Sequence, residues 1–355
     1  MRIGLIARAD TSGLSAKTHA FWRHMRPAKT LIVNMDEVPG VSTLPTELDR
    51  IQDANAKPWT PLGYPKVEPV PDPVVDEFLT GLDVVYTAET PYNYYLFERA
   101  RELGVATVMH VNPEYLDNWV YRDVPCPTVY WLPTFWFDGE IARLVHPEPV
   151  RVVPVPVDMD ASCDIQDIPI DQPIQLVHYA GVVPSGDRNG TQLLMEAMHL
   201  VKRDDVRLTI ASQRGLGDEI PPHTSICVES YRWPKDLPIG HVMVIPRRYG
   251  GLCLPMQEAM ARSMMVLMSD VTPQSAILPP GQCIPTSLGE TLWTGRLAIL
   301  TKVAAPSDIA TAIDSLTREQ IGLGMRWARS WAQANDWETL QPLIVDRLAE
   351  AVRLV

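Results

Sequence analysis

The chain has 355 residues, of which 46% are hydrophobic and 21% are charged, and its formal net charge is -12 at pH 7. This length predicts two domains, and this composition is typical of a globular protein and not of a disordered one. The sequence shows no apolar run of the roughly 18 residues that a membrane span needs, and its first residues lack a signal-peptide pattern. We therefore expect a cytoplasmic protein, and the acidic balance argues against a general polyphosphate-binding surface. The five cysteines never fall in a CxxC spacing, so they predict neither a disulfide framework nor a zinc site.

Short apolar strands alternate with helices through the first 150 residues. Strands are predicted at 2–7, 30–34, 83–87, 106–111 and up to 132, and helices at 18–25, 92–103 and from 136 onward. The proline-rich stretch from Lys57 to Glu77 is predicted to be an irregular connection, because proline fixes φ and lacks an N–H group. Strands that alternate with helices indicate a parallel sheet.

A second series of strands and helices follows the valine- and proline-rich segment from Arg151 to Asp160. Its strands are predicted at 174–179, 207–211, 241–245 and 265–269, and its helices at 191–201 and 256–263. We therefore predict an N-terminal domain over 1–158 and a C-terminal domain over 159–335. The last helix, at about 336–355, is predicted to pack back on the N-terminal domain.

The string PRRYGGLCLPMQEAMARSMMVLMSD, from Pro246 to Asp270, places two glycines directly before a predicted helix. Backbone N–H groups at this helix start, up to Met256, would favour an anion such as a nucleotide diphosphate. Glu258 can accept two hydrogen bonds from a ribose diol. On local physics alone, an ordinary glycine-containing loop is the commoner explanation. The candidate donor-binding residues of the string are Arg247, Arg248, Gly250, Gly251, Leu252, Cys253, Leu254 and Glu258.

The segment YGGLCLPMQEAMARSMMV resembles, without gaps, the signature ExFGxxxxEAMAxGxPV of retaining, family-four-like glycosyltransferases of the GT-B fold. The resemblance implies an α/β protein with two Rossmann-like domains, whose parallel sheets face one another across an interdomain cleft. Glu258 takes the place of the glutamate that holds the ribose in that family. Gly250 takes the place of the glutamate that contacts the donor sugar, so the usual recognition of that sugar is altered.

The segment QLVHYAGVVPSGDRNGTQLLMEAMHLV resembles the first strand, loop and helix of the C-terminal domain in the same family. Arg188 then occupies the position that neutralises donor phosphate, where fixed positive charge stabilises a leaving diphosphate. The lysine expected a few residues later is absent, and Arg247 or Arg248 can compensate. A solvated loop arginine is the alternative explanation.

In the N-terminal domain, Gly13 lies in the first loop after a strand, as does the glycine that lets the backbone approach the donor phosphate in this fold. Asp10, Lys17 and His19 flank it. His110 ends a predicted strand, where ligands of open α/β sheets bind, and the family places a donor-sugar contact there. Ordinary turn and core roles are the alternatives for Gly13 and His110. The first thirty residues also resemble phage-encoded glycosyltransferases.

These resemblances predict a retaining transfer of a hexose-like sugar from a nucleoside-diphosphate sugar, with Arg188 and His110 as catalytic residues. No cofactor and no metal is expected beyond the donor itself. The predicted partners are the nucleotide sugar and an acceptor, either a phage structural protein or a hydroxymethylated DNA base. A DNA acceptor would need the basic cluster Arg23, His24, Arg26 and Lys29.

Two rival functions remain open. The first is a catalytically degenerate protein that binds nucleotides or sugars, suggested by Gly250 in place of the family glutamate. The second is a nucleotide-sugar epimerase of the same fold. A nicotinamide-dependent dehydrogenase is excluded, because no GxGxxG motif follows the first strand.

Overall fold

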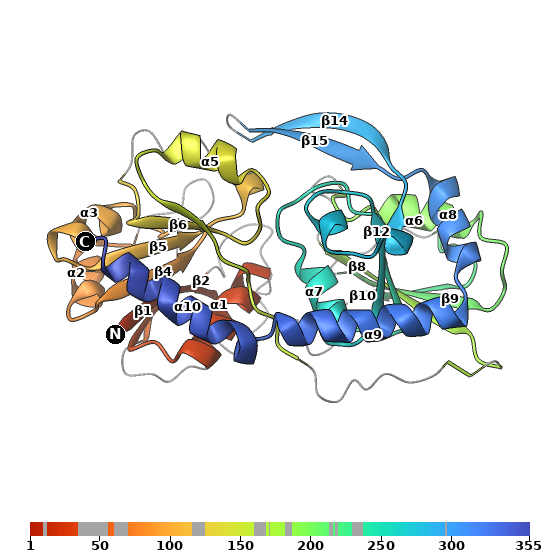
Figure 1. The fold of residues 1–355 in the computed structure, drawn as a ribbon, viewed down its shortest axis with the longest axis horizontal. Coiled ribbons are helices and arrows are strands. Elements are labelled where there is room, and N and C mark those ends of the chain that lie inside the picture. Colours follow the sequence, from red (N-terminus) through yellow and green to blue (C-terminus); the bar gives the residue numbers. More distant parts are fainter. Residues whose placement is uncertain are drawn as a thin grey trace. The chain divides into compact units, whose positions relative to one another are not determined.

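The computed structural model describes residues 1–9, 13–34, 56–59, 70–115, 125–159, 168–169, 171–181, 187–212, 216, 219–228, 237–294 and 297–355. The chain divides into two compact units. Unit 1 comprises Met1–Pro156, Thr294–Leu297 and Trp337–Val355, and unit 2 comprises Val157–Trp293 and Ala298–Asp336. Each unit is built on one main sheet flanked by helices (Figure 1).

Unit 1 contains a seven-stranded sheet in the order β3-β2-β1-β4-β5-β6-β7, in which every pair of neighbours is parallel. The first three strands are therefore added in one direction from β1, and β4 to β7 are added in order on the opposite side of β1. In such a sheet, ligands bind beyond the carboxyl ends of the strands where the order reverses, here between β1 and β4. The strands are β1 (Ile3–Ala9), β2 (Lys29–Asn34), β3 (Ala56–Trp59), β4 (Val84–Ala88), β5 (Ala106–His110), β6 (Val129–Leu132) and β7 (Val150–Val152).

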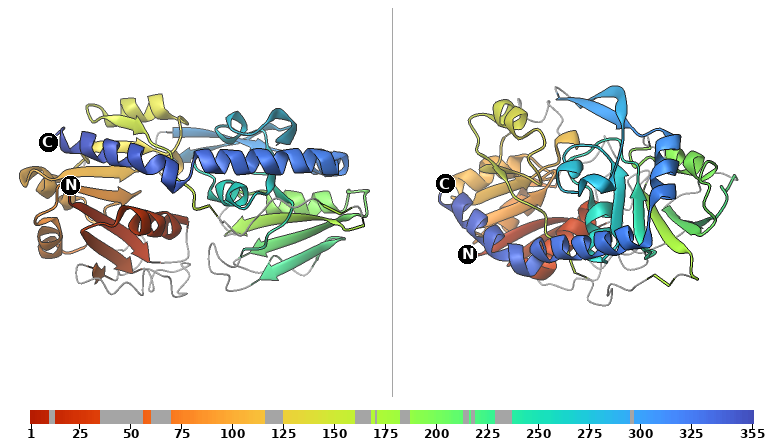
Figure 2. Two further views of the ribbon diagram at one scale, coloured as in Figure 1. Left: turned by 60° about the horizontal axis from the view of Figure 1, so that its bottom comes forward. Right: turned by 45° about the vertical axis from the view of Figure 1, so that its right-hand side comes forward.

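Helices cover both faces of this sheet, because alternate residues of each strand point to opposite faces. On β1, Leu5 belongs to the core under α1 (Gly13–Met25) and α10 (Trp337–Val352), whereas Ile6 belongs to the core under α2 (Asp72–Leu79), α3 (Tyr95–Glu102) and α5 (Asp138–Val145). The views in Figure 2 show α10 lying beside the N-terminal strands and helix of this unit. The last helix of the chain therefore covers part of one face of the first sheet.

Unit 2 repeats this architecture with a six-stranded parallel sheet in the order β10-β9-β8-β11-β12-β13. The order reverses between β8 and β11, which defines the expected ligand-binding edge of this sheet. A separate two-stranded sheet is formed by β14 (Ser287–Thr294) and β15 (Leu297–Val303). The strands of the main sheet are β8 (Ile174–Gly181), β9 (Val206–Ser212), β10 (Thr224–Val228), β11 (Val242–Ile245), β12 (Met265–Ser269) and β13 (Cys283–Ile284).

Two hydrophobic cores lie on the two faces of the second sheet. Residues of α6 (Thr191–Met198), α8 (Pro306–Ser315) and the first half of α9 (Arg318–Ala334) form one core with β8, β9, β11 and β12. The other core contains α7 (Leu254–Ala261) and the second half of α9, with Trp327 and Trp331 packed against it. The capping box of Thr317 and Gln320 fixes the start of α9.

The predicted α/β fold of two Rossmann-like domains with parallel sheets is confirmed. The prediction of an irregular connection over Lys57 to Glu77 is wrong in part, because this stretch contains β3 and the start of α2. Pro58 is tolerated because β3 is an edge strand. The prolines at the start of α2 occupy positions where no intrahelical N–H bond is lost. No helix in the described part of the chain is long and apolar enough to cross a membrane.

Candidate functional site

The ladder between β8 and β11 ends before the carboxyl edge of the sheet of unit 2. Their ladder pairs Val242 with Leu176 and Met243 with Val177. Just beyond it, the Nδ1–H of His178 donates to the carbonyl of Val244 over 2.8 Å. The hydroxyl of Thr191, the first residue of α6, donates to Nε2 of the same ring over 2.9 Å. Burial lowers the pKa of His178 to about 4, so a neutral imidazole holds the two strands and the helix start together.

The N-terminus of α6 is closed by an acidic side chain. The two carboxylate oxygens of Asp187 accept hydrogen bonds from the backbone N–H groups of Thr191 and Gln192, over 2.7 and 2.9 Å. Gly190, which directly precedes Thr191, has φ 72°, and a Cβ at this position would come within less than 3.0 Å of the carbonyl of Pro246. Asp187 therefore occupies the place that an anionic ligand would need at α6.

The N-terminus of α7 differs from that of α6. Its N-cap is Cys253, whose side chain makes no capping hydrogen bond within the described structure, and Pro255 follows in the first turn. The backbone N–H groups of Leu254 and Met256 lie in this first turn, where the helix itself supplies no acceptor. The helix begins two residues before the predicted start, so Leu254 is its first residue.

The loop before α7 is built around Arg247, which is only 1% exposed. Its Nη1 donates to Oδ1 of Asn189 over 2.9 Å, and its Nη2 donates to the carbonyl of Leu252 over 3.0 Å. Gly250 has φ 129°, and a Cβ at this position would come within less than 3.0 Å of the Arg247 guanidinium. The side chain of Arg247 and a side chain at position 250 therefore compete for the same space.

Gln274 holds the same loop from another direction. Its Nε2 donates to the carbonyls of Gly250 and Gly251 over 2.9 and 3.1 Å, and its side chain is buried. The carbonyls of this loop are thus bound by Arg247 and Gln274. Leu252 and Cys253 are buried as well. The loop is consequently fixed by buried hydrogen bonds before any ligand binds.

The three predicted arginines occupy different environments. Arg188 is half-buried beside the loop, with its guanidinium carbon 5.9 Å from the centre of the Tyr249 ring and its carbonyl bonded to the backbone N–H of Arg248. The side chain of Arg248 forms an ion pair of 3.0 Å with Glu290 on β14. Arg188 and Arg248 are both partly exposed beside the loop, whereas Arg247 is buried and supports the loop.

Glu258 lies on the second turn of α7, and its side chain is 17% exposed. The guanidinium of Arg262, one turn further along, is 3.6 Å from the carboxylate and almost completely buried. The ion pair directs one carboxylate oxygen toward Arg262 and leaves Glu258 the capacity to accept further hydrogen bonds. Arg262 was not singled out in the sequence, although the i, i+4 spacing is a signal for such a pair.

In unit 1, Gly13 is the first residue of α1, and the predicted neighbour Asp10 lies outside the described residues. His110 is the last residue of β5, is 2% exposed, and bonds through Nδ1 to the hydroxyl of Tyr86 over 3.0 Å. Burial and the charge of Lys17 hold the pKa of His110 well below its ordinary value, while the backbone of Val153 acts in the opposite direction. His110 is therefore a neutral imidazole.

Lys17 lies one turn into α1, with 5% of its surface exposed. Burial lowers the pKa of Lys17 to about 7, and the carboxylate of Glu89 opposes this shift. The Nδ2 of Asn112 donates to Glu89 over 2.6 Å, so the carboxylate follows β4 in a fixed place. Lys17, Glu89 and His110 come from segments that follow or end β1, β4 and β5, at the edge where the strand order of unit 1 reverses.

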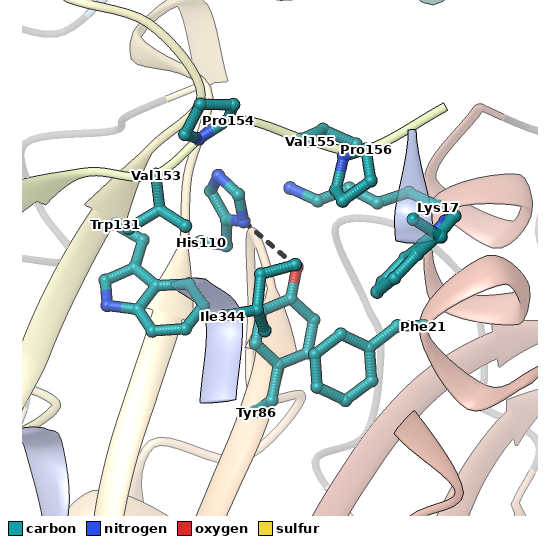
Figure 3. Close-up of a pocket in the computed structure, with 11 residues that line it drawn as sticks. Lys17, Phe21, Tyr86, His110, Trp131, Val153, Pro154, Val155, Pro156 and Ile344 are labelled. Carbon is teal, nitrogen blue, oxygen red and sulfur yellow. Dashed lines mark hydrogen bonds between the residues drawn. The ribbon is translucent and has the colours of Figure 1, made fainter. Parts of the chain in front are cut away.

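Lys17 and His110 border a small cavity of about 10 Å³, which is the room of about one water molecule. Lys17, Tyr86 and His110 line it together with Phe21, Trp131 and the segment Val153–Pro156. Figure 3 shows the Lys17 amine and the His110 ring pointing into the same space, with the hydrogen bond between Tyr86 and His110 drawn. Among the described residues, Nζ of Lys17 has no hydrogen-bond partner, whereas the His110 ring is hydrogen-bonded to Tyr86 and to the backbone of Val153.

The structure thus brings the candidate residues into two groups, one in each unit. Arg188, Arg247, Arg248, Gly250 to Leu254 and Glu258 belong to unit 2, and Gly13 and His110 belong to unit 1. Sequence analysis did not identify Tyr86, Arg262 or Gln274 as contributors. Among the described residues, no three or more His, Cys, Asp or Glu side chains are grouped so that they could hold a metal ion.

The two parallel sheets and their strand order define the GT-B architecture. No model of a known protein family matches the sequence, and no curated protein matches it. Solved structures match in fold: sucrose-phosphate synthase from Thermosynechococcus elongatus has a TM-score of 0.64 at 14% identity, over 99% of this chain and 99% of that chain. The Anabaena protein HepE in complex with UDP has a TM-score of 0.62 at 12% identity, over 99% and 100% of the two chains. A glycosyltransferase from Rickettsia africae has a TM-score of 0.62 at 10% identity, over 99% and 98%.

Proposed function

We propose that this chain is a glycosyltransferase that moves a sugar from a nucleoside-diphosphate sugar to an acceptor, with retention of the anomeric configuration. The observation that carries the proposal is the difference between the two helix starts in unit 2. The carboxylate of Asp187 fills the N-terminus of α6, whereas the first turn of α7 has no side-chain cap. Glu258 follows on the second turn of α7, and Arg188 lies near Tyr249 of the loop that precedes this helix. A diphosphate fits the start of α7, and a ribose diol fits Glu258.

The proposed reaction breaks the bond between the anomeric carbon and the donor phosphate oxygen. A bond from the anomeric carbon to an acceptor oxygen forms on the same face, and the acceptor proton leaves with the diphosphate. Negative charge grows on the diphosphate as the first bond breaks, so fixed positive charge near it lowers the barrier. Arg188 and the first turn of α7 supply that charge. The proposal includes no protein nucleophile and no metal, and His110 is a proposed contact of the transferred group.

Uridine diphosphate is the first donor nucleotide to test. HepE of Anabaena has been solved with UDP and with UDP-glucose, the latter at a TM-score of 0.62 and 11% identity. The donor sugar cannot meet a glutamate side chain at position 250 in this chain. We propose that backbone groups of the loop replace it, since Arg247 and Gln274 fix the loop from two directions.

A protein acceptor fits unit 1 better than DNA does. His24 stacks on Trp337 at 4.7 Å between ring centres, and the Nζ of Lys29 donates to the carbonyls of Glu77 and Thr80. Two members of the basic cluster that a DNA groove would need are therefore engaged within the unit. We propose a phage structural protein as the acceptor class, in line with the resemblance of the first thirty residues, and hydroxymethylated DNA is the alternative outcome of the test.

The experiment measures thermal stabilisation by a panel of nucleoside diphosphates and their sugars, followed by donor hydrolysis and transfer with each acceptor class. A ligand at a hundredfold of its Kd stabilises the folded state by about 2.7 kcal/mol. Arg188→Ala and Glu258→Ala should lose the selective shift. Arg326→Ala on α9 and Glu196→Ala on α6 are matched controls at exposed positions and should keep it.

The rival functions give different results in this experiment. A catalytically degenerate protein, the alternative that Gly250 suggests, would bind a nucleotide sugar without hydrolysing or transferring it. An epimerase would convert the free nucleotide sugar without an acceptor. Absence of a shift with every nucleotide would refute the proposed donor site.

A further inference from the structure

A single buried side chain holds two successive peptides of the loop before α7. Gln274 is 1% exposed, and its Nε2 donates to the carbonyl oxygens of Gly250 over 2.9 Å and of Gly251 over 3.1 Å. An amide nitrogen carries two hydrogens, and both are used here. The partners also settle the orientation of the amide, because the reverse orientation would place Oε1 against two carbonyl oxygens that only accept hydrogen bonds.

The oxygen of the same amide lacks a bond, and this carries a cost. Oε1 of Gln274 is buried and has no hydrogen-bond partner in the part of the chain that the structure describes. A buried acceptor that is left unbonded costs about 1 to 3 kcal/mol. An apolar side chain could fill the same space without this cost, so the two bonds to the loop are what the amide contributes.

The segment that carries Gln274 is itself held in place. Gln274 begins the short 3₁₀ turn η4 (Gln274–Ala276), and its carbonyl accepts hydrogen bonds from the N–H groups of Ile277 and Leu278 over 2.9 and 3.1 Å. Val271 and Leu278, on either side of this turn, belong to the same hydrophobic core as residues of α7. The amide therefore reaches the loop from a segment that is packed in the core of unit 2.

The direction of the two carbonyls determines the direction of two backbone N–H groups. In a planar trans peptide the C=O and N–H bonds point in opposite directions, and neither of these two peptides is cis. The N–H groups of Gly251 and Leu252 share these peptides and therefore point away from Gln274. Successive N–H groups on one side of a loop attract an anion. The N–H of Leu252, a residue only 7% exposed, has no acceptor within the described structure.

We propose that Gln274 is a positioning residue for the donor diphosphate. By holding the carbonyls of Gly250 and Gly251, it turns the N–H groups of Gly251 and Leu252 toward the phosphate oxygens at the start of α7. This inference rests on the proposed glycosyltransferase function and adds to it a residue that the donor does not touch. Gln274 acts on the phosphates alone, whereas Glu258 binds the ribose.

The test compares a nucleoside diphosphate with its parent nucleoside, because only the diphosphate uses the N–H groups that Gln274 turns. The pairs are UDP with uridine, GDP with guanosine and ADP with adenosine. The diphosphates are titrated calorimetrically, and the nucleosides are followed by saturation-transfer NMR, which suits weak ligands. Gln274→Met has a similar length and no donor. In the pair that binds the wild type, it should weaken the diphosphate by about tenfold or more and the nucleoside by less than about twofold.

Two further variants separate positioning from folding. Gln274→Glu keeps the shape of the side chain but offers at most one hydrogen-bond donor, so it should lose diphosphate affinity as Gln274→Met does. Gln282→Met removes another buried glutamine from the chain that follows β12, and it should bind both ligands as the wild type does. Thermal unfolding without ligand sets a temperature at which each variant is folded.

Three results would overturn the proposal: equal losses of diphosphate and nucleoside affinity in Gln274→Met, undiminished diphosphate binding in that variant, or an equally selective loss in Gln282→Met. Equal losses would mean that Gln274 only maintains the fold of the site. All three leave the proposed function intact, since the wild type still binds its nucleotide. A wild type that binds no nucleoside diphosphate would instead refute the donor site, and this inference with it.

Discussion

Replacing Lys17 by methionine should make the folded protein more stable. Methionine has a similar length and no charge, so it can fill the same space between α1 and the sheet of unit 1. The wild-type ammonium is buried beside Phe21 and Tyr86 and makes no hydrogen bond within the described structure. Removal of this group relieves a desolvation cost that the folded state carries.

The lowered pKa gives the size and the sign of the effect. Burial moves the pKa of Lys17 from 10.5 to about 7, and each unit corresponds to about 1.36 kcal/mol, so the cost is at most about 5 kcal/mol. Above pH 10.5 the lysine is neutral in both the folded and the unfolded state, so its burial costs no free energy of unfolding. As the pH falls from 10.5 to about 7, the unfolded state is protonated first and the folded state loses stability. Lys17→Met should therefore exceed the wild type most at pH 7 and below, and the difference should shrink as the pH rises toward 10.5.

Urea unfolding of wild type and Lys17→Met, measured from pH 7 to pH 10 by a probe in unit 1, tests the prediction. Thermal unfolding at pH 7 should show a rise in Tm of up to roughly 10 °C. Lys202→Met, at an exposed position, should change neither quantity by more than about 0.5 kcal/mol. A destabilised Lys17→Met, or a gain in stability that does not change with pH, would refute the assignment of a buried ammonium with a lowered pKa.

Three further changes should show which contacts hold the loops of unit 2. Gly250→Ala should cost about 2 to 3 kcal/mol in urea unfolding, because its Cβ would overlap Arg247 at a φ of 129°, whereas Gly281→Ala, with open space around it, should be nearly neutral; equal effects would contradict this account. Asp187→Ala should cost about 1 kcal/mol by removing the cap of α6, which the same titration measures, and no loss would show that the cap contributes nothing. The pKa of His178 is lowered from 6.5 to about 4, so its contribution is complete above pH 6.5 and up to about 3 kcal/mol should be lost as the pH falls to 4, a step that should be absent in His178→Phe.

The architecture could be predicted from the sequence because it depends on patterns that repeat along the chain. Alternating apolar strands and helices predict parallel sheets, and the strand Met265–Ser269 has the predicted bounds. The stretch Lys57 to Glu77 was misjudged because proline content alone does not distinguish a loop from an edge strand or a helix start. An edge strand and the first turn of a helix both tolerate proline, so the proline content does not show which of these structures a segment forms.

The chemistry of the candidate sites was less accessible, since it depends on pairs of residues that are distant in the sequence. The ring of His110 is hydrogen-bonded through Nδ1 to the hydroxyl of Tyr86, which is 24 residues away. The orientation of the loop before α7 depends on Gln274, which lies beyond the next strand. No local pattern marks either residue. The pair Glu258 and Arg262 is the exception, because its i, i+4 spacing on a helix can be recognised in the sequence.

Gly250 illustrates how a departure from a family signature changes meaning once its neighbour is known. By sequence alone, a glycine in place of the glutamate suggests that a binding group has been lost. In the structure, the space that a side chain at 250 would enter is filled by the Arg247 guanidinium, which bonds to Asn189 and to the carbonyl of Leu252. Gly250→Glu would therefore bring a side chain into collision with a buried cation without restoring a sugar contact. The two residues form one structural unit, so any restoration of an acidic side chain at 250 requires a smaller residue at 247 and another partner for Asn189.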